Sequence, residues 1–340
     1  MGVMRRSTAF FVTGGTGFIG GKLVAKLVRQ GHAVRALVRP TSKREDLKGE
    51  RITAVEGDIR DQSSLQKGME GCSAVFHLAA YAKNWARDPR TFFELNVEGT
   101  RNVLRAARLV GVERVVLTST MVTLGPTPPG VVGDESMPRI TPRFFTEYEE
   151  SKTIAEREAL RAAADGLPVV VVNPTRVYGP GRLTEGNSVT VMIDLYDRGR
   201  LPVLLAGGAN VGNYALVDDL VTGHILAMER GRPGERYILG GENVSLRGLF
   251  DLVDEATGKR HLRFSLSPRL AKAYGRLEEK KAEWFGLYPR ITPGWVETFL
   301  QEWAYSSAKA ERDLGYTITP LEEGIRLTCD WLHRRGRSGG

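Results

Sequence analysis

The stretch TGGTGFIG, residues 13–20, joins an apolar segment to an amphipathic one. The preceding TAFFV (8–12) is typical of a buried β-strand, and the following GGKLVAKLVRQG (20–31) has the apolar spacing of a helix and ends at Gly31, a common C-cap residue. Glycines spaced as G-x-x-G-x-x-G allow a tight turn and let backbone N–H groups approach a pyrophosphate at the positive end of the helix. The residues of this turn that we expect to contact a dinucleotide are Gly14, Gly17, Phe18, Ile19 and Gly20.

Strand-like and helix-like segments alternate beyond this turn. Strands are predicted at 33–38, 52–55, 74–78, 114–118 and 169–173, with helices between them at 61–69, 91–110 and 146–164. Alternation at this spacing predicts an α/β fold with a doubly wound parallel sheet of the Rossmann type.

The alternation weakens after residue 181, although 213–231 and 235–241 look like one more helix and strand that return to the sheet. The remainder is helical, with interruptions at Pro and Gly. We expect two domains, the second a smaller, mostly helical, discontinuous substrate lobe that caps the carboxyl edge of the sheet, where ligands bind in such folds. The dinucleotide-binding domain would comprise residues 1–180 and 212–241, and the substrate lobe residues 181–211 and 242–335.

The composition of the chain limits the classes of protein to which it can belong. The chain has 340 residues, 41% hydrophobic and 26% charged, with a formal net charge of +8. Its basic clusters, Arg5-Arg6 and Arg334-Arg335-Arg337, fall near the two ends, so we expect solvated surface charge and no nucleic-acid partner. Two isolated cysteines, no metal-ligand spacing, no signal-peptide pattern and no apolar run of membrane-spanning length predict a cytoplasmic protein without a disulfide framework, a metal or a membrane span.

The segment YEESK places Tyr148 and Lys152 at positions i and i+4, on one face of a helix. A cation beside a phenol favours phenolate, so this tyrosine could exchange a proton near neutral pH. The preceding strand ends in three hydroxyl residues, at the edge where one of them could hydrogen-bond a substrate oxygen. These hydroxyl residues are Thr118, Ser119 and Thr120.

These features together resemble the extended branch of the short-chain dehydrogenase/reductase superfamily, over nearly the whole chain. The motifs, in the family's order, are TGGTGFIG, GDIRD, HLAA, NVEGTRNVL, YEESKTIAE, NPTRVYGPG and LVDDLVTGH. The resemblance implies that Tyr148 is the general acid/base, that Lys152 lowers its pKa and binds the nicotinamide ribose, and that Thr120 is the substrate-oxygen donor, with Ser119 the second choice. It also implies a structural role for Asn96.

The same resemblance assigns further residues to a bound dinucleotide. Asp58 and Ile59 would border the adenine, and Pro174 and Val177 the nicotinamide. The residues expected at the ribose and pyrophosphate are Leu78, Ala79 and Ala80, with Thr118 as a further cofactor contact.

Several runs, including GERYILGGENVSL, look like bacterial members described either as dihydroflavonol-4-reductase-like or as hopanoid-associated sugar epimerases. Epimerases of this branch grip a diphosphate with an Arg in the pattern R-D-[YFW]-x-x-V-x-D, but here Gly212 replaces that Arg and Asn213 the Asp. Aromatic residues also lie near the expected substrate site, which favours an apolar or aromatic carbonyl compound over a sugar. These aromatic residues are Tyr81, Trp85, Phe144 and Phe145.

We therefore expect an NADP(H)-dependent carbonyl reductase/alcohol dehydrogenase acting on a small apolar or aromatic ketone or aldehyde. The alternatives are an NAD(P)-dependent sugar epimerase or dehydratase and a redox-silent dinucleotide-binding protein.

The segment VRALVRPTSKR (34–44) bears on the cofactor, because an acid that binds the ribose of NAD is usual near its Arg39. Arg39, with Lys43 or Arg44, could instead bind a 2′-phosphate. We expect NADP(H) to be preferred, with NAD(H) possible. A homodimer that pairs the helices at 91–110 and 146–164 is a further expectation.

Overall fold

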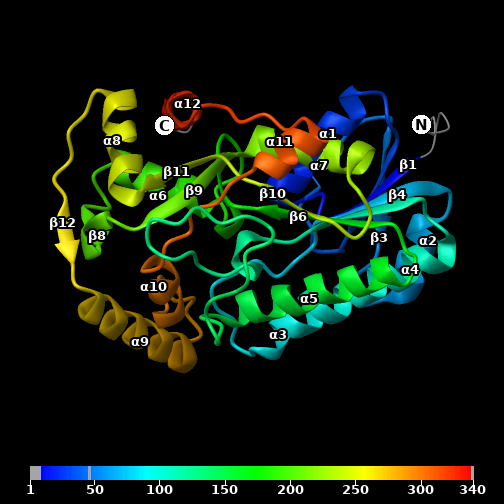
Figure 1. Cartoon of the computed structure of the whole chain (residues 1–340), viewed down its shortest axis with the longest axis horizontal. Coiled ribbons are helices and arrows are strands. Elements are labelled where there is room, and N and C mark those ends of the chain that lie inside the picture. Colours follow the sequence, from blue (N-terminus) through cyan, green and yellow to red (C-terminus); the bar gives the residue numbers. More distant parts are fainter. Residues whose placement is uncertain (1–8, 45–46, 338–340) are drawn as a thin grey trace.

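The computed structural model describes residues 9–44 and 47–337 (Figure 1). Thr8 and the basic pair Arg5-Arg6 lie outside the described residues. A seven-stranded parallel sheet forms the centre, in the order β10-β6-β5-β4-β1-β2-β3. Its strands are β1 (Ala9–Thr13), β2 (Val34–Val38), β3 (Ile52–Glu56), β4 (Cys72–His77), β5 (Arg114–Thr118), β6 (Val169–Pro174) and β10 (Arg236–Leu239).

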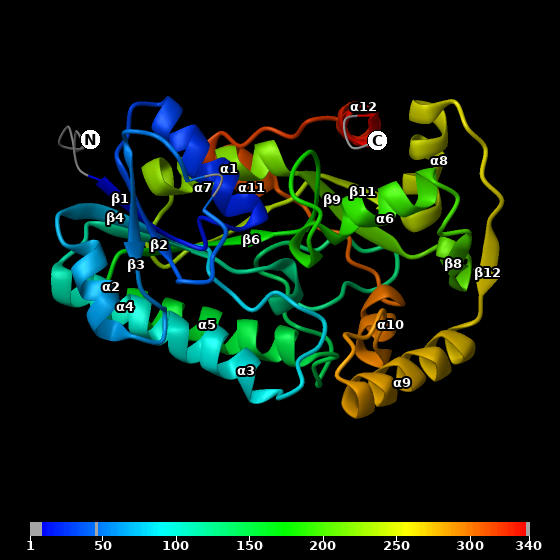
Figure 2. The ribbon, with the colours of Figure 1, turned by 180° about the vertical axis from the view of Figure 1, so that it is seen from behind.

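Helices cover both faces of this sheet (Figures 1 and 2). One apolar core joins the sheet to α1 (Phe18–Arg29), α7 (Val217–Arg230) and α11 (Ala308–Leu314). A second core joins the other face to α2 (Gln62–Met69), α4 (Gly99–Val110) and α5 (Glu147–Ala164). Helices on both faces of a parallel sheet confirm the predicted doubly wound fold.

The helix predicted at 91–110 is divided in the structure. A short α3 (Arg90–Phe93) leads into a π-helical turn, Glu94–Glu98, before α4 begins at Gly99. The turn contains Asn96, whose side-chain oxygen accepts from the backbone N–H of Tyr81 at 2.7 Å and whose amide donates to Ser151 Oγ at 2.9 Å. The π-helical turn is thus tied by side-chain bonds to two other segments, a detail that apolar spacing does not show.

The prediction of a helix over 213–231 is wrong in its first four residues. β9 (Val211–Leu216) is a strand of a separate three-stranded sheet, between β7 (Arg176–Tyr178) and β11 (Glu242–Ser245). α7 begins only at Val217, whereas β10 joins the central sheet as predicted. A buried run of four residues is compatible with either state, and only pairing with β7 and β11 decides it.

The rest of the chain builds a layer beside the carboxyl edge of the central sheet (Figure 1). α12 packs against α6 and α8, and α10 packs against α9. The elements of this layer are α6 (Ser188–Asp197), β8 (Val203–Leu205), α8 (Leu246–Thr257), β12 (Phe264–Leu266), α9 (Pro268–Phe285), α10 (Pro293–Phe299) and α12 (Leu321–Arg337). Among the helices that the structure describes, none is both long and apolar enough to cross a membrane.

Candidate active site

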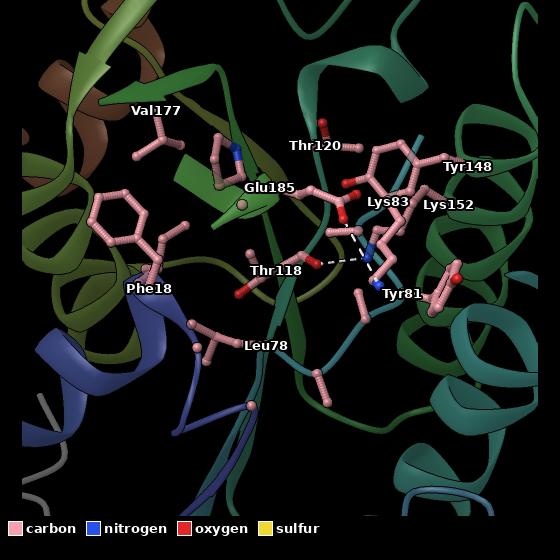
Figure 3. A pocket seen from close by; sticks show the side chains of 18 of the residues that line it. Phe18, Leu78, Tyr81, Lys83, Thr118, Thr120, Tyr148, Lys152, Val177 and Glu185 are labelled. Carbon is pink, nitrogen blue, oxygen red and sulfur yellow. Dashed lines mark hydrogen bonds and ion pairs between the residues drawn. The ribbon is translucent and has the colours of Figure 1, made fainter. Parts of the chain in front are cut away.

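A cavity of about 930 Å³ follows the carboxyl edge of the central sheet. It extends from the turn after β1, past the ends of β4 and β5, to α5 and α10. Figure 3 shows Thr120, Tyr148 and Lys152 together at one wall, with Phe18 and Val177 across from them. Parallel strands that end at one edge bring these distant segments together, as expected for a doubly wound sheet.

The glycine turn has the shape that a pyrophosphate requires. Gly14 has a φ of +74°, and a Cβ there would lie 2.6 Å from the backbone nitrogen of Ala79. A Cβ at Gly20 would lie 2.1 Å from the carbonyl oxygen of Gly14, so neither position tolerates a side chain. Gly17, the N-cap of α1, supplies no capping side chain, and the first turn contains no acidic residue. The helix therefore presents unsatisfied N–H donors and a positive end to the cavity, which fits the phosphates of a dinucleotide.

The end of the cavity beside β2, where we expect the adenosine of a dinucleotide, combines Arg39, Ser42 and Asp58. Asp58 pairs with Arg60 at 2.9 Å, and its pKa is lowered chiefly by that hydrogen bond, with a smaller contribution from the charge of Arg39. Arg39 itself lies exposed at the end of β2. Because Asp58 is already paired, the cation of Arg39 is available to an anionic group at this end.

Lys43 and Arg44, the other two basic residues of this segment, are not among those that line the cavity. The Arg44 guanidinium pairs instead with Glu56 at the end of β3, at 3.0 Å. Sequence spacing could not show this, because β3 lies beyond the segment and only the sheet brings it alongside β2. Ser42, which the sequence did not single out, takes their place in the lining.

Buried hydrogen bonds position the loop after β4. The Thr100 hydroxyl donates to the carbonyl oxygen of Asn96, so it accepts from Nε2 of His77, at 3.1 Å. His77 Nδ1 then accepts from the Thr13 hydroxyl at 2.7 Å, and that hydroxyl accepts from the backbone N–H of Ala79 at 3.2 Å. Burial lowers the pKa of His77 to about 3, which keeps the ring neutral. The network ties the ends of β1 and β4 to the π-helical turn.

Lys152 and Thr118 are joined at the catalytic end. Lys152 Nζ donates to the carbonyl oxygen of Thr118 at 2.9 Å (Figure 3). The Thr118 hydroxyl contacts Nε2 of His224 at 2.9 Å, and because His224 Nδ1 donates to Leu220, the hydroxyl is the donor. Burial lowers the pKa of His224 to about 4, so this arrangement is neutral. Lys152 is thereby held at the end of β5 by a backbone acceptor.

The pKa values of Tyr148 and Lys152 move in opposite directions. Burial raises the pKa of Tyr148 to about 12, and hydrogen bonding to Thr120 acts the other way. Burial lowers the pKa of Lys152 to about 8, opposed by the charge of Glu156. The direction for Tyr148 is opposite to the lowering expected from the resemblance, because loss of water around the phenol outweighs the effect of Thr120. The phenol of Tyr148 is therefore neutral at neutral pH in this arrangement.

Ser119 and Thr120 have different surroundings although both line the cavity. The Ser119 hydroxyl donates to the buried carboxylate of Glu156, which also accepts from Thr123 at 2.7 Å and from Asn173 at 2.8 Å. The Thr120 side chain lies beside Tyr148 (Figure 3). The Ser119 hydroxyl is therefore occupied by a buried carboxylate, whereas the Thr120 side chain lies beside Tyr148.

The wall opposite the glycine turn includes residues that sequence reasoning missed. α10 contributes Trp295, Thr298 and Phe299, and the two rings lie 4.1 Å apart. Of the four aromatic residues proposed from the sequence, only Tyr81 lines the cavity. Trp85 contacts the ring of Tyr288, Phe144 lies 4.5 Å from the guanidinium of Arg139, and Phe145 packs on the core around Trp303.

Arg176 is a second residue that the sequence did not identify. It lines the cavity from β7, 4.4 Å from the ring of Phe299, and donates to the hydroxyl of Tyr214 at 3.2 Å. No carboxylate in the described part of the chain lies within ion-pair distance of it. A cation at this place, between aromatic rings, could bind an oxygen-bearing group of a substrate.

The rim of the cavity is bridged by charged residues. Lys83 pairs with Glu185 at 3.8 Å (Figure 3), and Tyr288 donates to the same carboxylate at 2.5 Å. These residues come from three segments far apart in the chain, so no local sequence pattern brings them together. They join the loop after β4 to the segment that links α9 and α10.

The cavity lining contains most of the residues proposed from the sequence. Those that line it are Gly14, Gly17, Phe18, Ile19, Gly20, Arg39, Asp58, Ile59, Leu78, Ala79, Ala80, Thr118, Thr120, Tyr148, Lys152, Pro174 and Val177. Within the described residues, no group of three or more His, Cys, Asp or Glu side chains could hold a metal ion.

Comparison with known proteins places this site in a class. The chain is an NAD(P)-dependent oxidoreductase of the extended short-chain dehydrogenase/reductase type. It belongs to the NAD dependent epimerase/dehydratase family, whose model matches residues 10–240.

Proteins named as reductases and a protein named as an epimerase both resemble the chain. It is 35% identical to the "Putative dihydroflavonol 4-reductase" of Synechocystis, over 96% of this chain and 95% of that one. It is 32% identical to the 4-hydroxy-2-methyl-3-oxo-4-farnesyl-3,4-dihydroquinoline-1-oxide ketoreductase of Stigmatella aurantiaca, over 90% and 91% of the two chains. The structure of a UDP-glucose 4-epimerase of Thermotoga maritima with UDP-glucose has a TM-score of 0.79 and 25% identity, covering 96% of this chain and 99% of that one.

Proposed function

We propose that the protein is an NADP(H)-dependent carbonyl reductase/alcohol dehydrogenase acting on a small apolar or aromatic ketone or aldehyde. The observation that carries this proposal is the placement of the Thr120 and Tyr148 side chains beside Lys152 (Figure 3), in a cavity that also has an aromatic wall. Trp295 and Phe299 make that wall apolar, which suits a substrate with little to hydrogen-bond. Two relatives that are named reductases support the same chemistry.

In the proposed reaction, each residue of the site has a separate role. NADPH, bound along the glycine turn, supplies the hydride that adds to the carbonyl carbon. The Thr120 and Tyr148 hydroxyls bind the carbonyl oxygen, and Tyr148 gives it the proton as negative charge develops there. The Lys152 ammonium, held by the carbonyl of Thr118, stabilises the resulting phenolate. Oxidation of the alcohol reverses these transfers.

The preference for NADP(H) rests on the adenosine end. Arg39 is exposed and lines the cavity, and Ser42, whose hydroxyl accepts from the backbone N–H of Arg39 at 3.2 Å, lies beside it. A guanidinium and a hydroxyl suit a 2′-phosphate better than a free 2′-hydroxyl. Lys43 and Arg44 do not line the cavity, so we assign them no role in binding the 2′-phosphate.

A second function, sugar epimerase or dehydratase, is favoured by one observation. The epimerase pattern lacks its Arg at Gly212, but the guanidinium of Arg176 occupies the adjoining space. A cation is therefore present near the place where a diphosphate would be held, although it comes from a different strand. Its contacts with Phe299 and Tyr214 make it part of an aromatic surface, which suits a planar carbonyl compound better than a pyrophosphate.

The deciding experiment incubates the protein with NADPH and a panel of aldehydes, diketones, flavanonols and steroids, and in parallel with NAD and UDP-sugars. Consumption of NADPH with an apolar carbonyl compound, and no interconversion of UDP-sugars, is the expected result. Interconversion of a UDP-sugar without net change in the cofactor would replace the first function by the second.

Three further expectations are kept as proposals. The layer of residues 181–211 and 242–335 selects the substrate, because α10 supplies the aromatic wall. A homodimer would pair the outer faces of α4 and α5. A reducing cytoplasm suits the two cysteines, Cys72 and Cys329, which are both free and buried.

A further inference from the structure

α9 is an amphipathic helix whose apolar face points away from the protein. The residues that it buries are small or polar: Ala271, Gly275, Glu278 and Ala282. Its large apolar residues are between 42% and 72% exposed, and they are Leu270, Tyr274, Leu277, Trp284 and Phe285. An ordinary surface helix shows the reverse arrangement.

The exposed apolar residues form a stripe along one side of the helix, interrupted by Lys281 between Leu277 and Trp284. Leu270, Tyr274, Leu277 and Trp284 recur at i, i+4, i+7 and i+14, which places them on one side of an α-helix. Contiguous exposed apolar surface on a helix commonly marks a site of interaction. Figures 1 and 2 show α9 at the outer edge of the molecule, with α10 between it and the central sheet.

Basic residues border the stripe along one side. Arg269, Arg276 and Lys280 recur at i, i+7 and i+11, on a face next to that of the apolar residues. None of the three forms an ion pair with the described residues, whereas Lys272 pairs with Glu297 and Lys281 with Glu278. The unpaired cations are therefore available to negative charge outside the protein.

We propose that α9 docks the protein on the surface of an anionic lipid bilayer. Its apolar stripe would enter the boundary between headgroups and acyl chains, and Arg269, Arg276 and Lys280 would contact anionic headgroups. A tryptophan at one end of the stripe suits this boundary, because its ring is apolar and its N–H is polar. The helix lies on the bilayer and does not cross it.

The position of α9 connects this surface to the cavity. Gly275 lies close against α10, where an added Cβ would be 3.0 Å from the backbone nitrogen of Pro293. α10 carries Trp295 and Phe299 of the cavity wall, and Tyr288, which follows α9, bonds to Glu185 at the rim. If the proposed reductase function holds, a docked protein could take a lipid-soluble carbonyl compound from the bilayer. Docking itself does not depend on that function.

The test is flotation of the full chain with vesicles of phosphatidylcholine, with or without phosphatidylglycerol. We expect flotation with the anionic vesicles, weakened by salt, and little with phosphatidylcholine alone. The double variant Leu277→Ser/Trp284→Ser should lose at least about tenfold in vesicle affinity, and Arg276→Glu/Lys280→Glu should lose a similar factor. Leu109→Ser, at an exposed leucine on α4, is the matched control and should float as the unmodified chain does.

Three outcomes overturn the proposal. These are no flotation with anionic vesicles, flotation that the two double variants do not weaken, and light scattering in which Leu277→Ser/Trp284→Ser converts a dimer to a monomer. In the last case the stripe is an interface between two copies of the chain. Failure of the carbonyl panel with flotation intact would overturn the reductase function and leave docking standing.

Discussion

The guanidinium of Arg176 lies where a side chain at position 212 would have to go. A Cβ built on Gly212 would be 2.8 Å from Nη1 of Arg176, and the two residues sit on paired strands, with Arg176 opposite Tyr214 in the register of β7 and β9. The missing side chain at Gly212 thus makes room for a cation in the cavity wall. In the sequence alone, Gly212 indicates only the loss of an arginine.

This relationship predicts that Gly212→Ala displaces Arg176. We expect Gly212→Ala and Arg176→Ala each to raise KM for the carbonyl substrate by about tenfold, the scale of one charge-assisted hydrogen bond, with NADP(H) affinity unchanged. The double variant should be little worse than either single one, because both act through the same guanidinium. Steady-state kinetics of the four proteins measures this.

Gly336→Ala on α12 is a suitable control, because the residue lies outside the cavity lining and an added Cβ there meets nothing closer than Arg198 Nη2 at 4.0 Å. Additive effects of the two changes on KM would mean that Gly212 acts by some other route than Arg176.

Tyr148→Phe should lower turnover by at least about a hundredfold, the usual scale for loss of a general acid. Affinity for NADP(H) should stay nearly intact, because the ring remains and only the hydroxyl is lost. Lys152→Met, in contrast, should damage both turnover and cofactor affinity. Turnover close to normal in Tyr148→Phe would move the proton donor elsewhere.

Thr120 and Ser119 should respond differently to loss of their hydroxyls. Thr120→Val should lower turnover and Thr120→Ser should restore it, because the hydroxyl faces Tyr148. Ser119→Ala removes a donor to the buried carboxylate of Glu156, so it should lower the free energy of unfolding by about 1–3 kcal/mol. Denaturant unfolding and kcat separate the two effects. If Ser119→Ala instead lowered kcat and left the free energy of unfolding unchanged, Ser119 would be the donor to the substrate oxygen.

The affinity of the free protein for NADPH should fall as the pH rises through about 8. Burial lowers the pKa of Lys152 to about 8, so its ammonium is present below that pH and is lost above it. Tyr148, with its pKa raised to about 12, stays neutral throughout this window. Fluorescence titration between pH 6 and 10 measures the fall, and Lys152→Arg should abolish it because arginine stays charged. An unchanged pH dependence in Lys152→Arg would assign the transition to another group.

Arg39→Asp should weaken NADP(H) by about ten- to a hundredfold and abolish or reverse the preference over NAD(H). Lys43→Asp, the same change of charge at a residue outside the cavity lining, should alter affinity far less. Tighter binding of NAD(H) than of NADP(H) by the unmodified chain would refute the assignment and strengthen the epimerase alternative.

Local pattern was enough for the parts of this protein that depend on a few neighbouring residues. The glycine turn could be read from TGGTGFIG, because its tight backbone geometry requires glycine at Gly14 and Gly20. Tyr148 and Lys152 were paired by helical spacing alone, and the central strands by their apolar runs. Each of these features follows from backbone geometry over one turn or one strand.

Tertiary structure decided what depends on segments far apart in the chain. The sheet brings Arg44 to Glu56, with which it pairs, so that Arg39 is the only one of the three basic residues Arg39, Lys43 and Arg44 that lines the cavity. Packing also places the Ser119 hydroxyl where it donates to Glu156. Strand pairing makes residues 213–216 part of β9. Tertiary structure also replaced the expected aromatic residues of the substrate wall by Trp295 and Phe299, and placed Arg176 beside Gly212. The direction of the pKa of Tyr148 was decided in the same way, since burial is a property of the folded chain. The motifs determine the glycine turn and the Tyr148–Lys152 pair, whereas packing between distant segments determines which charges remain free and which side chains form the cavity wall.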